Sequence, residues 1–341
     1  MAKITILAEE GCASSTVSGL VDAFSVADMW WALLGKKGRL FECRIATVDG
    51  KPVTANGGIV VAPNCSIHEA EGSDLIVVPG FLPPFDLTTP RMKAIFAWLK
   101  ERREKGEPIA ALCTGTFLLA ESGLLDGLAA TTNWQFAGEF RRRYPGVNLE
   151  VDRLITESPG LFCAGATSAF LNLCLKIIEI YGGAELASLC ARALLIDPER
   201  VSQAPYMLHD FWKNHADASI LRAQKLMEES LAERISIDGI ASEVHISPRH
   251  FKRRFKSATG ESPLAYLQHL RIEKAKKHLE DTRDSINEIA FGVGYEDVNS
   301  FRKIFRKITG MSPKDYRGKF SCFSAPPVGA GERPVQAYQS A

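Results

Sequence analysis

The sequence has no long hydrophobic run. Its apolar segments stop well short of the roughly 18 consecutive residues that a membrane-spanning helix requires, although 46% of the 341 residues are hydrophobic. The first ten residues, MAKITILAEE, lack the basic, apolar and small-residue regions of a signal peptide, and their alternation indicates a β-strand. We therefore expect a cytoplasmic protein that has no membrane contact.

Metal-binding sequence patterns are also missing. The eight cysteines form no CxxC pair and match no zinc spacing, so most of them are expected to be small buried hydrophobic residues. None of the seven histidines shows metal-ligand spacing. The sequence therefore predicts neither a metal site nor a cofactor.

The net charge of +1 conceals an asymmetry between the two ends of the chain. Residues 1–219 hold 20 Lys and Arg against 25 Asp and Glu, whereas residues 220–319 hold 20 against 14. A basic C-terminal block that follows an acidic first block favours an anionic partner for the second block alone.

The pattern of apolar residues divides the chain into an α/β part and an all-α part. Over residues 1–195, short apolar runs alternate with segments of helical spacing, which is typical of a flavodoxin-like parallel sheet sandwiched by helices. Residues 196–219 break this pattern and are predicted to be a linker. Residues 220–320 have helical spacing, and residues 321–341, rich in Pro, Gly, Ala and Ser, are predicted to form a disordered tail.

An internal repeat is the strongest pattern in the all-α part. The segments SIDGIASEVHISPRHFKRRFKSATGESP, from Ser236, and SINEIAFGVGYEDVNSFRKIFRKITGMSP, from Ser285, share their apolar positions, a glycine and a final Ser-Pro pair. Ser236, Ser247 and Ser285 stand where helix N-caps are needed, and Gly260 and Gly310 where C-caps are needed. Each copy is therefore predicted to be a helix, a tight turn and a second helix.

The second helix of each copy has two different faces. Phenylalanines at positions i and i+4 form a face that is expected to be buried. The opposite face carries Arg249, His250, Lys252, Arg253 and Lys256 in the first copy, and Asn299, Arg302, Lys303, Arg306 and Lys307 in the second. Such a helix can pack on one side and enter the major groove of double-stranded DNA with the other. Two matched copies favour this interpretation over a protein-binding helical module whose basic residues are merely solvated.

Residues 220–319 closely resemble the DNA-binding domain of AraC/XylS-type regulators. The matching segments are IASEVHISPRHFKRRFKSATGESP, YLQHLRIEKAKKHL and IAFGVGYEDVNSFRKIFRKITGMSPKDYR. The resemblance implies that Arg249 and Arg253 face bases from the first recognition helix. It implies the same for Val298, Asn299 and Lys303 in the second, and the remaining cationic residues are expected at phosphates. RNA polymerase is an implied partner, and paired DNA sites lead us to expect a homodimer.

Cys113 is the main candidate for chemistry in the α/β part. It lies in IAALCTGTFLLAESGLL, between an expected buried strand and a helix. This arrangement is similar to a nucleophile elbow, where a sharp turn exposes a side chain over a helix N-terminus and main-chain N–H groups favour a thiolate or a bound anion. The spacing alone is equally compatible with a buried structural cysteine.

Residues 1–195 resemble the DJ/PfpI superfamily. The matches are DLIVVPG, ALCTGTFLLAESGLLDG, ATTNW and CAGATSAFLNLCLKII. Enzymes of this superfamily carry an acidic residue on the first helix, and many relatives carry a histidine in an ATTHW motif. Thr16 and Asn133 align with these two positions, so Cys113 lacks both of its usual titratable partners, and neutral replacements are poor proton-transfer groups.

The two resemblances together point to the GlxA-like regulators. They favour a sequence-specific transcription regulator without enzyme activity, whose first domain dimerises and binds a small-molecule effector. The predicted ligand-binding residues are Cys113, Thr114, Asn133, Trp134 and Thr16, and the resemblance implies an amine or amino-acid-type metabolite as ligand. Two alternatives remain open, a Cys113-dependent hydrolase and a thiol-based sensor, each fused to a DNA-binding domain.

Overall fold

The computed structural model describes residues 1–82, 86–209, 213, 215–233 and 236–321. Contacts divide the chain into two compact units, Met1–Met207 and Leu208–Ala341. The division falls inside the predicted linker, and the predicted tail, except for Ser321, lies outside the described residues. No helix within the described ranges is long and apolar enough to cross a membrane.

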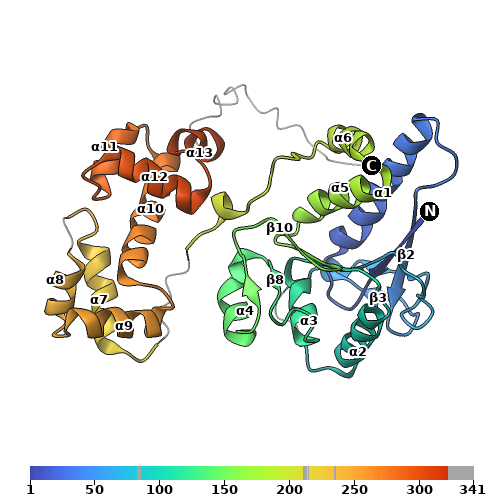
Figure 1. Cartoon of the computed structure of the whole chain (residues 1–341), viewed down its shortest axis with the longest axis horizontal. Coiled ribbons are helices and arrows are strands. Elements are labelled where there is room, and N and C mark those ends of the chain that lie inside the picture. The colour runs from blue at the N-terminus through green and yellow to red at the C-terminus, as the bar shows by residue number, and fades with distance from the viewer. Residues whose placement is uncertain (83–85, 210–212, 214, 234–235, 322–341) are drawn as a thin grey trace, which may run out of the picture. The chain divides into compact units, whose positions relative to one another are not determined.

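A seven-stranded sheet forms the centre of the first unit, in the order β10-β11-β7-β6-β1-β2-β5 (Figure 1). Its strands are β1 (Ala2–Leu7), β2 (Phe41–Thr47), β5 (Cys65–Ser66), β6 (Leu75–Val78), β7 (Ile109–Leu112), β10 (Ile155–Ser158) and β11 (Leu161–Ala164). Neighbouring strands are parallel, except that β10 pairs antiparallel with β11. Every residue of β6 and β7 is buried, as expected for central strands that are covered on both faces.

Helices cover both faces of this sheet (Figure 1). On one face, α1 (Ser14–Leu33), α5 (Ala169–Gly182) and α6 (Ala184–Ala193) pack against one another. On the other face lie α2 (Pro90–Glu104), α3 (Thr116–Glu121) and α4 (Ala137–Arg143). Two small ribbons, β3 (Val53–Thr54) with β4 (Val60–Val61) and β8 (Ala129–Ala130) with β9 (Asn148–Leu149), complete this unit. The predicted sheet between two helical layers is confirmed.

The second unit is helical over its described residues. Its helices are α7 (Ala218–Glu229), α8 (Ile237–Glu243), α9 (Pro248–Thr259), α10 (Pro263–Asp281), α11 (Ile286–Gly292), α12 (Val298–Thr309) and α13 (Pro313–Phe320). They enclose two cores, one around Phe251 and Phe255 and the other around Phe301 and Phe305. Helix α10 contributes buried residues to both cores, so it joins the two predicted helix-turn-helix units.

The helix ends follow the caps that the repeat predicts. The Ser236 hydroxyl accepts from the Gly239 N–H, and Ser285 forms a reciprocal capping box with Glu288. Gly260 and Gly310 end α9 and α12 in the left-handed conformation. Ser247 occupies the predicted N-cap position of α9, but its side chain makes no capping hydrogen bond. The proline that follows it begins the helix without an N–H to satisfy.

The two turns between paired helices differ at the residue that takes a left-handed conformation, which leads to a prediction. His245 has φ +57° in the first turn, where the second turn has Gly294 at φ +87°. A left-handed conformation costs a residue with a side chain about 1–2 kcal/mol, partly offset by the backbone entropy that glycine loses on folding. We expect His245→Gly to stabilise the domain by several tenths of a kcal/mol, as measured by thermal unfolding.

The corresponding substitution in the second turn, Gly294→Ala, is expected to lower the stability of the domain. A Cβ on Gly294 would lie 2.6 Å from the carbonyl oxygen of Leu231, so Gly294→Ala adds a steric clash to the conformational cost. We expect a loss of about 2 kcal/mol in the free energy of unfolding. Equal stability changes in the two variants would contradict this explanation of the turns.

Candidate DNA-binding and ligand-binding sites

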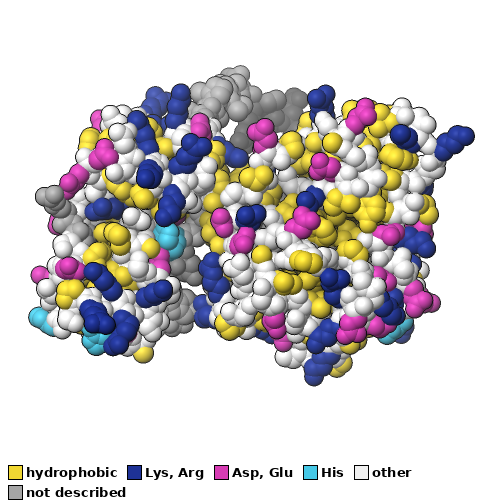
Figure 2. Space-filling model, in the orientation of Figure 1, with side chains coloured by type: hydrophobic (Ala, Val, Ile, Leu, Met, Phe, Trp, Pro, Cys, Tyr) yellow, Lys and Arg dark blue, Asp and Glu magenta, His cyan; other side chains and the backbone are white. Residues whose placement is uncertain are grey.

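The first candidate DNA-binding face lies on α9. Phe251 and Phe255 are fully buried on one side of this helix. All five predicted contact residues are exposed on the remaining surface, namely Arg249, His250, Lys252, Arg253 and Lys256. Figure 2 shows Lys and Arg side chains gathered over α9 at the lower end of this unit. The helix therefore has the packed face and the exposed cationic face that insertion into a major groove requires, although Lys252 also lies 3.5 Å from the carboxylate of Asp238.

The second candidate face lies on α12 and repeats this arrangement. Phe301 and Phe305 are fully buried, whereas Asn299, Arg302, Lys303 and Arg306 are exposed and Val298 is partly buried at the first turn. The side chain of Asp297 accepts hydrogen bonds from the N–H groups of Asn299 and Ser300. These bonds hold the start of α12, from which base-contacting residues of a recognition helix project.

In each repeat, a tyrosine that the sequence analysis did not single out packs against a phenylalanine of the second helix. Phe255 makes an edge contact with Tyr266 of α10, at a ring-centroid distance of 5.3 Å. Phe305 makes the equivalent contact with Tyr316 of α13, at 5.5 Å. Both tyrosines lie three residues after the Pro of the repeated Ser-Pro pair, a regular spacing that could have identified them as a further part of the repeat.

An ion pair fixes α9 to the start of α7. Asp217 is the N-cap of α7, where its carboxylate accepts from the Ile220 N–H. The same carboxylate forms two 2.7 Å hydrogen bonds with the guanidinium group of Arg254. Arg254 is therefore occupied in positioning the recognition helix, and its hydrogen bonds hold the pKa of Asp217 below its usual range.

The Asp217–Arg254 pair makes stability depend on pH. A carboxyl group whose pKa is lowered in the folded state stabilises that state above its unfolded pKa of about 4, and the contribution disappears as the pH falls through the folded value. Asp217→Asn keeps a capping oxygen but loses the charge. We expect a loss of about 1 kcal/mol at pH 7 that shrinks below pH ~4. Urea denaturation at both pH values tests this, and a difference independent of pH would contradict it.

Cys113 lies at a strained turn in the first unit. Its φ of +54° is a left-handed value that residues with a side chain rarely adopt. The turn runs directly from β7 into a short 3₁₀ segment, Cys113–Gly115, and then into α3. A Cβ on Gly115 would lie within 2.9 Å of the carbonyl oxygens of Val78 and Pro79, so this position requires glycine. The backbone has the sharp turn of the predicted elbow, but Cys113 is only 4% exposed, so the elbow does not present the thiol at the surface.

Two neutral groups donate hydrogen bonds to the thiol sulfur of Cys113. The Nδ2 of Asn133 lies 3.6 Å from Sγ, and the Oγ1 of Thr167 lies 3.8 Å from it. The sequence analysis named Asn133 but missed Thr167, although the segment that contains it was among those carrying the family resemblance. The backbone at the turn is held as well, since the hydroxyl of Thr132 donates to the Cys113 carbonyl at 2.8 Å.

The other predicted ligand-binding residues have different partners. Thr114 is buried, and its Oγ1 donates to the Phe81 carbonyl at 2.5 Å and accepts from the Phe81 N–H at 2.7 Å. The hydroxyl of Thr16 donates to the Ala13 carbonyl at 2.6 Å, within the first turn of α1. Trp134 follows Asn133 in a 3₁₀ turn and is partly buried. The hydroxyl groups of Thr16 and Thr114 are therefore bonded to backbone groups, whereas the side chains of Asn133 and Thr167 contact Cys113.

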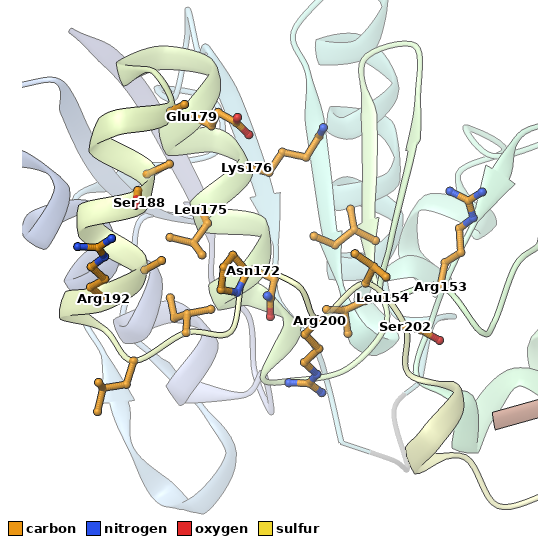
Figure 3. A pocket seen from close by; sticks show the side chains of 18 of the residues that line it. Arg153, Leu154, Asn172, Leu175, Lys176, Glu179, Ser188, Arg192, Arg200 and Ser202 are labelled. Atoms are coloured by element: carbon orange, nitrogen blue, oxygen red, sulfur yellow. The ribbon is translucent and has the colours of Figure 1, made fainter. Parts of the chain in front are cut away.

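A separate cavity of about 1160 Å³ lies between α5, α6 and the chain from Ile196 to Ser202 (Figure 3). Its lining includes four cationic residues, Arg153, Lys176, Arg192 and Arg200, and two acidic ones, Asp152 and Glu179. Cys113 and Asn133 are not among the lining residues. The first unit thus has a cavity, lined by both apolar and charged residues, that is distinct from the elbow.

Comparisons with known proteins agree with both halves of this description. Residues 2–180 match the DJ-1/PfpI family, and residues 240–319 match a helix-turn-helix domain. The HTH-type transcriptional regulator GbdR of Pseudomonas aeruginosa is 27% identical over 305 residues, which cover 89% of this chain and 81% of that protein. The HTH-type transcriptional regulator GlxA of Rhizobium meliloti is 24% identical over 277 residues, covering 78% of this chain and 84% of that protein.

A solved structure shares the fold. The crystal structure of an AraC family transcriptional regulator from Pseudomonas putida superposes with a TM-score of 0.50 at 17% identity, covering 57% of this chain and all of that one. The family resemblances that the sequence motifs predicted are confirmed. The chain belongs to the DJ-1/PfpI family, and its second domain makes it a helix-turn-helix transcriptional regulator of the AraC and GlxA type.

Proposed function

We propose that this regulator binds operator DNA through α9 and α12, and that a small molecule bound beside Cys113 controls the binding. The observation that carries the DNA-binding part is the duplication: two helices bury matched phenylalanines and leave matched cationic faces exposed. Base edges would be read by Arg249, Arg253, Val298, Asn299 and Lys303, and phosphates would be contacted by His250, Lys252, Lys256, Arg302 and Arg306.

The surroundings of Cys113 favour an effector site over an active site. Thiol catalysis needs a group that removes or donates protons near neutral pH. The side chains that contact the sulfur are an amide, Asn133, and a hydroxyl, Thr167, and neither exchanges protons readily at pH 7. Both can donate hydrogen bonds to an anionic or carbonyl-bearing ligand, which suits the predicted amino-acid-type metabolite. We therefore propose a regulator without enzyme activity.

The proposed function also leads to an expected oligomeric state. Operators with paired half-sites are bound by symmetric proteins, so we propose a homodimer formed through the first domain. Contact with RNA polymerase and a cytoplasmic location are the further expectations for a transcription regulator.

DNA binding by the full-length protein tests the main proposal. The protein is titrated against its own upstream region, genomic fragments and random DNA over a series of salt concentrations. We expect selective binding with a specific Kd of about 10⁻⁸–10⁻¹¹ M and a steep loss of affinity with salt. Equal affinity for all fragments, with and without a panel of amines and amino acids, would contradict the proposal.

The location of the effector can be tested with two variants. Once an amine or amino acid that alters DNA binding is found, Asn133→Ala is expected to abolish its effect. Arg192→Ala, in the separate cavity between α5 and α6, is expected to leave the effect unchanged. The reverse result would place the effector in that cavity. Turnover of an ester or amide substrate that disappears in Cys113→Ala would instead support the hydrolase alternative.

A further inference from the structure

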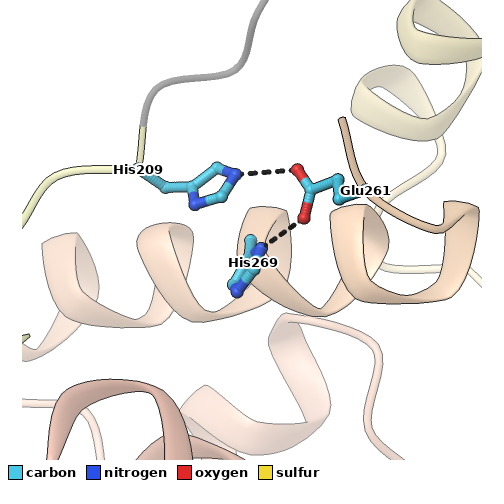
Figure 4. A group of neighbouring side chains, drawn as sticks. All are labelled: His209, Glu261 and His269. Carbon is cyan, nitrogen blue, oxygen red and sulfur yellow. Dashed lines mark hydrogen bonds and ion pairs between the residues drawn. The ribbon is translucent and has the colours of Figure 1, made fainter. Parts of the chain in front are cut away.

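Three side chains that are far apart in the sequence meet in the second unit (Figure 4). The Nε2 of His209 lies 2.9 Å from one carboxylate oxygen of Glu261, and the Nδ1 of His269 lies 2.8 Å from the other. The two imidazole rings are stacked, with centroids 4.0 Å apart and an angle of 29° between their planes. One carboxylate is thus held between two imidazoles that come from different segments.

The Glu261 side chain is not required by the turn in which it lies. In the first repeat, the Thr259 hydroxyl donates to the Glu261 carbonyl at 3.2 Å, between α9 and α10. In the second repeat, Thr309 makes the same 3.2 Å bond to Met311. Methionine therefore supports the same backbone conformation, and the carboxylate at position 261 is an addition that serves the two histidines.

The composition and spacing of this cluster suit a metal ion. The three ligand atoms all lie within 4.8 Å of one another, and the His209, Glu261 and His269 side chains are 25%, 19% and 27% exposed. Imidazole and carboxylate ligands bind Zn²⁺ at about 2.0–2.2 Å in tetrahedral geometry, which places ligand atoms about 3.3 Å apart. The two nitrogen–oxygen distances would have to lengthen by about half an ångström. Since each imidazole bonds to a different oxygen of Glu261, the carboxylate would also have to turn one oxygen toward both nitrogens.

We propose that His209, Glu261 and His269 form a binding site for a divalent transition-metal ion of the Zn²⁺ type. The ligands are His209 Nε2, His269 Nδ1 and one oxygen of Glu261, and a water molecule completes the tetrahedron. The sequence analysis expected no metal site, because 52 and 8 residues separate the histidines from the glutamate. No short spacing motif contains all three.

The site has a consequence for regulation, which rests on the proposed function. His209 lies where the chain enters the second unit, whereas Glu261 and His269 lie at the end of the first recognition unit and on α10. A bound ion would tie the entering chain to the helix that joins both recognition units. Metal occupancy would then alter the freedom with which the effector domain is attached to the DNA-binding domain.

Zinc binding by the full-length protein tests the site directly. Zinc chloride is titrated in competition with a chromophoric chelator, and we expect one ion per chain to be bound at this site. His209→Ala and His269→Ala each remove a ligand, and loss of a group that only supports a ligand already costs about 10–100-fold. Each variant should therefore weaken binding by at least about 100-fold, and Glu261→Gln by at least about 10-fold.

His278→Ala is the matched control, because His278 lies on the same helix, α10, outside the cluster. It is expected to bind zinc like the unmodified protein. The site is disproved if the unmodified protein binds no zinc, or if the cluster variants and His278→Ala bind it equally. Circular dichroism checks folding, and His209→Ala, which lies outside the helices, preserves the test if His269→Ala does not fold. Zinc binding is measured without DNA, so its failure is separate from a failure of the regulator proposal.

Discussion

Replacing Arg249 or Arg253 by alanine is expected to weaken binding to the specific operator by about 1–3 kcal/mol for each residue. Both side chains are exposed on α9, opposite the buried Phe251 and Phe255. Arginine makes two hydrogen bonds to the edge of a guanine, so its loss should also relax sequence preference at one base position. Binding to a set of operators that differ by single base pairs measures both effects.

The lysines of the same helix are expected to behave differently. Lys252→Ala and Lys256→Ala should weaken binding to every DNA by a similar factor and lower the slope of log affinity against log salt by about 1. Lys225→Ala is the control, because it removes the same charge from α7, outside the recognition helices. The assignment of roles fails if the arginine and lysine variants lose affinity equally for operator and random DNA, or if Lys225→Ala matches them.

The features that the sequence analysis predicted well are those encoded locally. Helix caps, turn glycines and the i, i+4 spacing of phenylalanines depend on residues a few positions apart. The repeat doubled that information, because each copy confirms the other. The central strands were also accessible, since a run such as Ile109–Leu112 is buried on both faces and carries no polar residue. The family motifs supplied the neighbours of Cys113, of which Asn133 does contact the sulfur.

The features that were missed depend on residues that only the fold brings together. Thr167 reaches Cys113 from 54 positions away, and Asp217 reaches Arg254 from 37 positions away. Arg254 belongs to a run of basic residues. Its residue type alone therefore does not show whether it forms a structural ion pair or contacts DNA. Its copy-two counterpart is Ile304, and this departure from the repeat is the signal that separates a structural arginine from those that remain free for DNA.

Phe301→Ala is expected to lower the free energy of unfolding of the second helix-turn-helix unit by about 3–5 kcal/mol. Phe301 is fully buried on α12 and packs against Phe305 and Tyr295. Its removal leaves a cavity between α12 and its neighbours that a unit of this size cannot easily close. Because whole domains are stable by only about 5–15 kcal/mol, this loss is a large fraction of the total, and the second recognition helix should open much more often.

Phe291→Ala makes a matched control, because Phe291 belongs to α11 of the same unit and is 54% exposed. Its replacement is expected to change stability by no more than about 0.5 kcal/mol. Hydrogen exchange of peptides from α11, α12 and α13 in the full-length protein separates the two outcomes. Phe301→Ala should accelerate exchange there while leaving α8 and α9 protected, since Phe251 and Phe255 belong to a different core. Equal acceleration in both helix-turn-helix units would mean that α10 couples them into one cooperative structure. The two recognition helices could then not be destabilised separately.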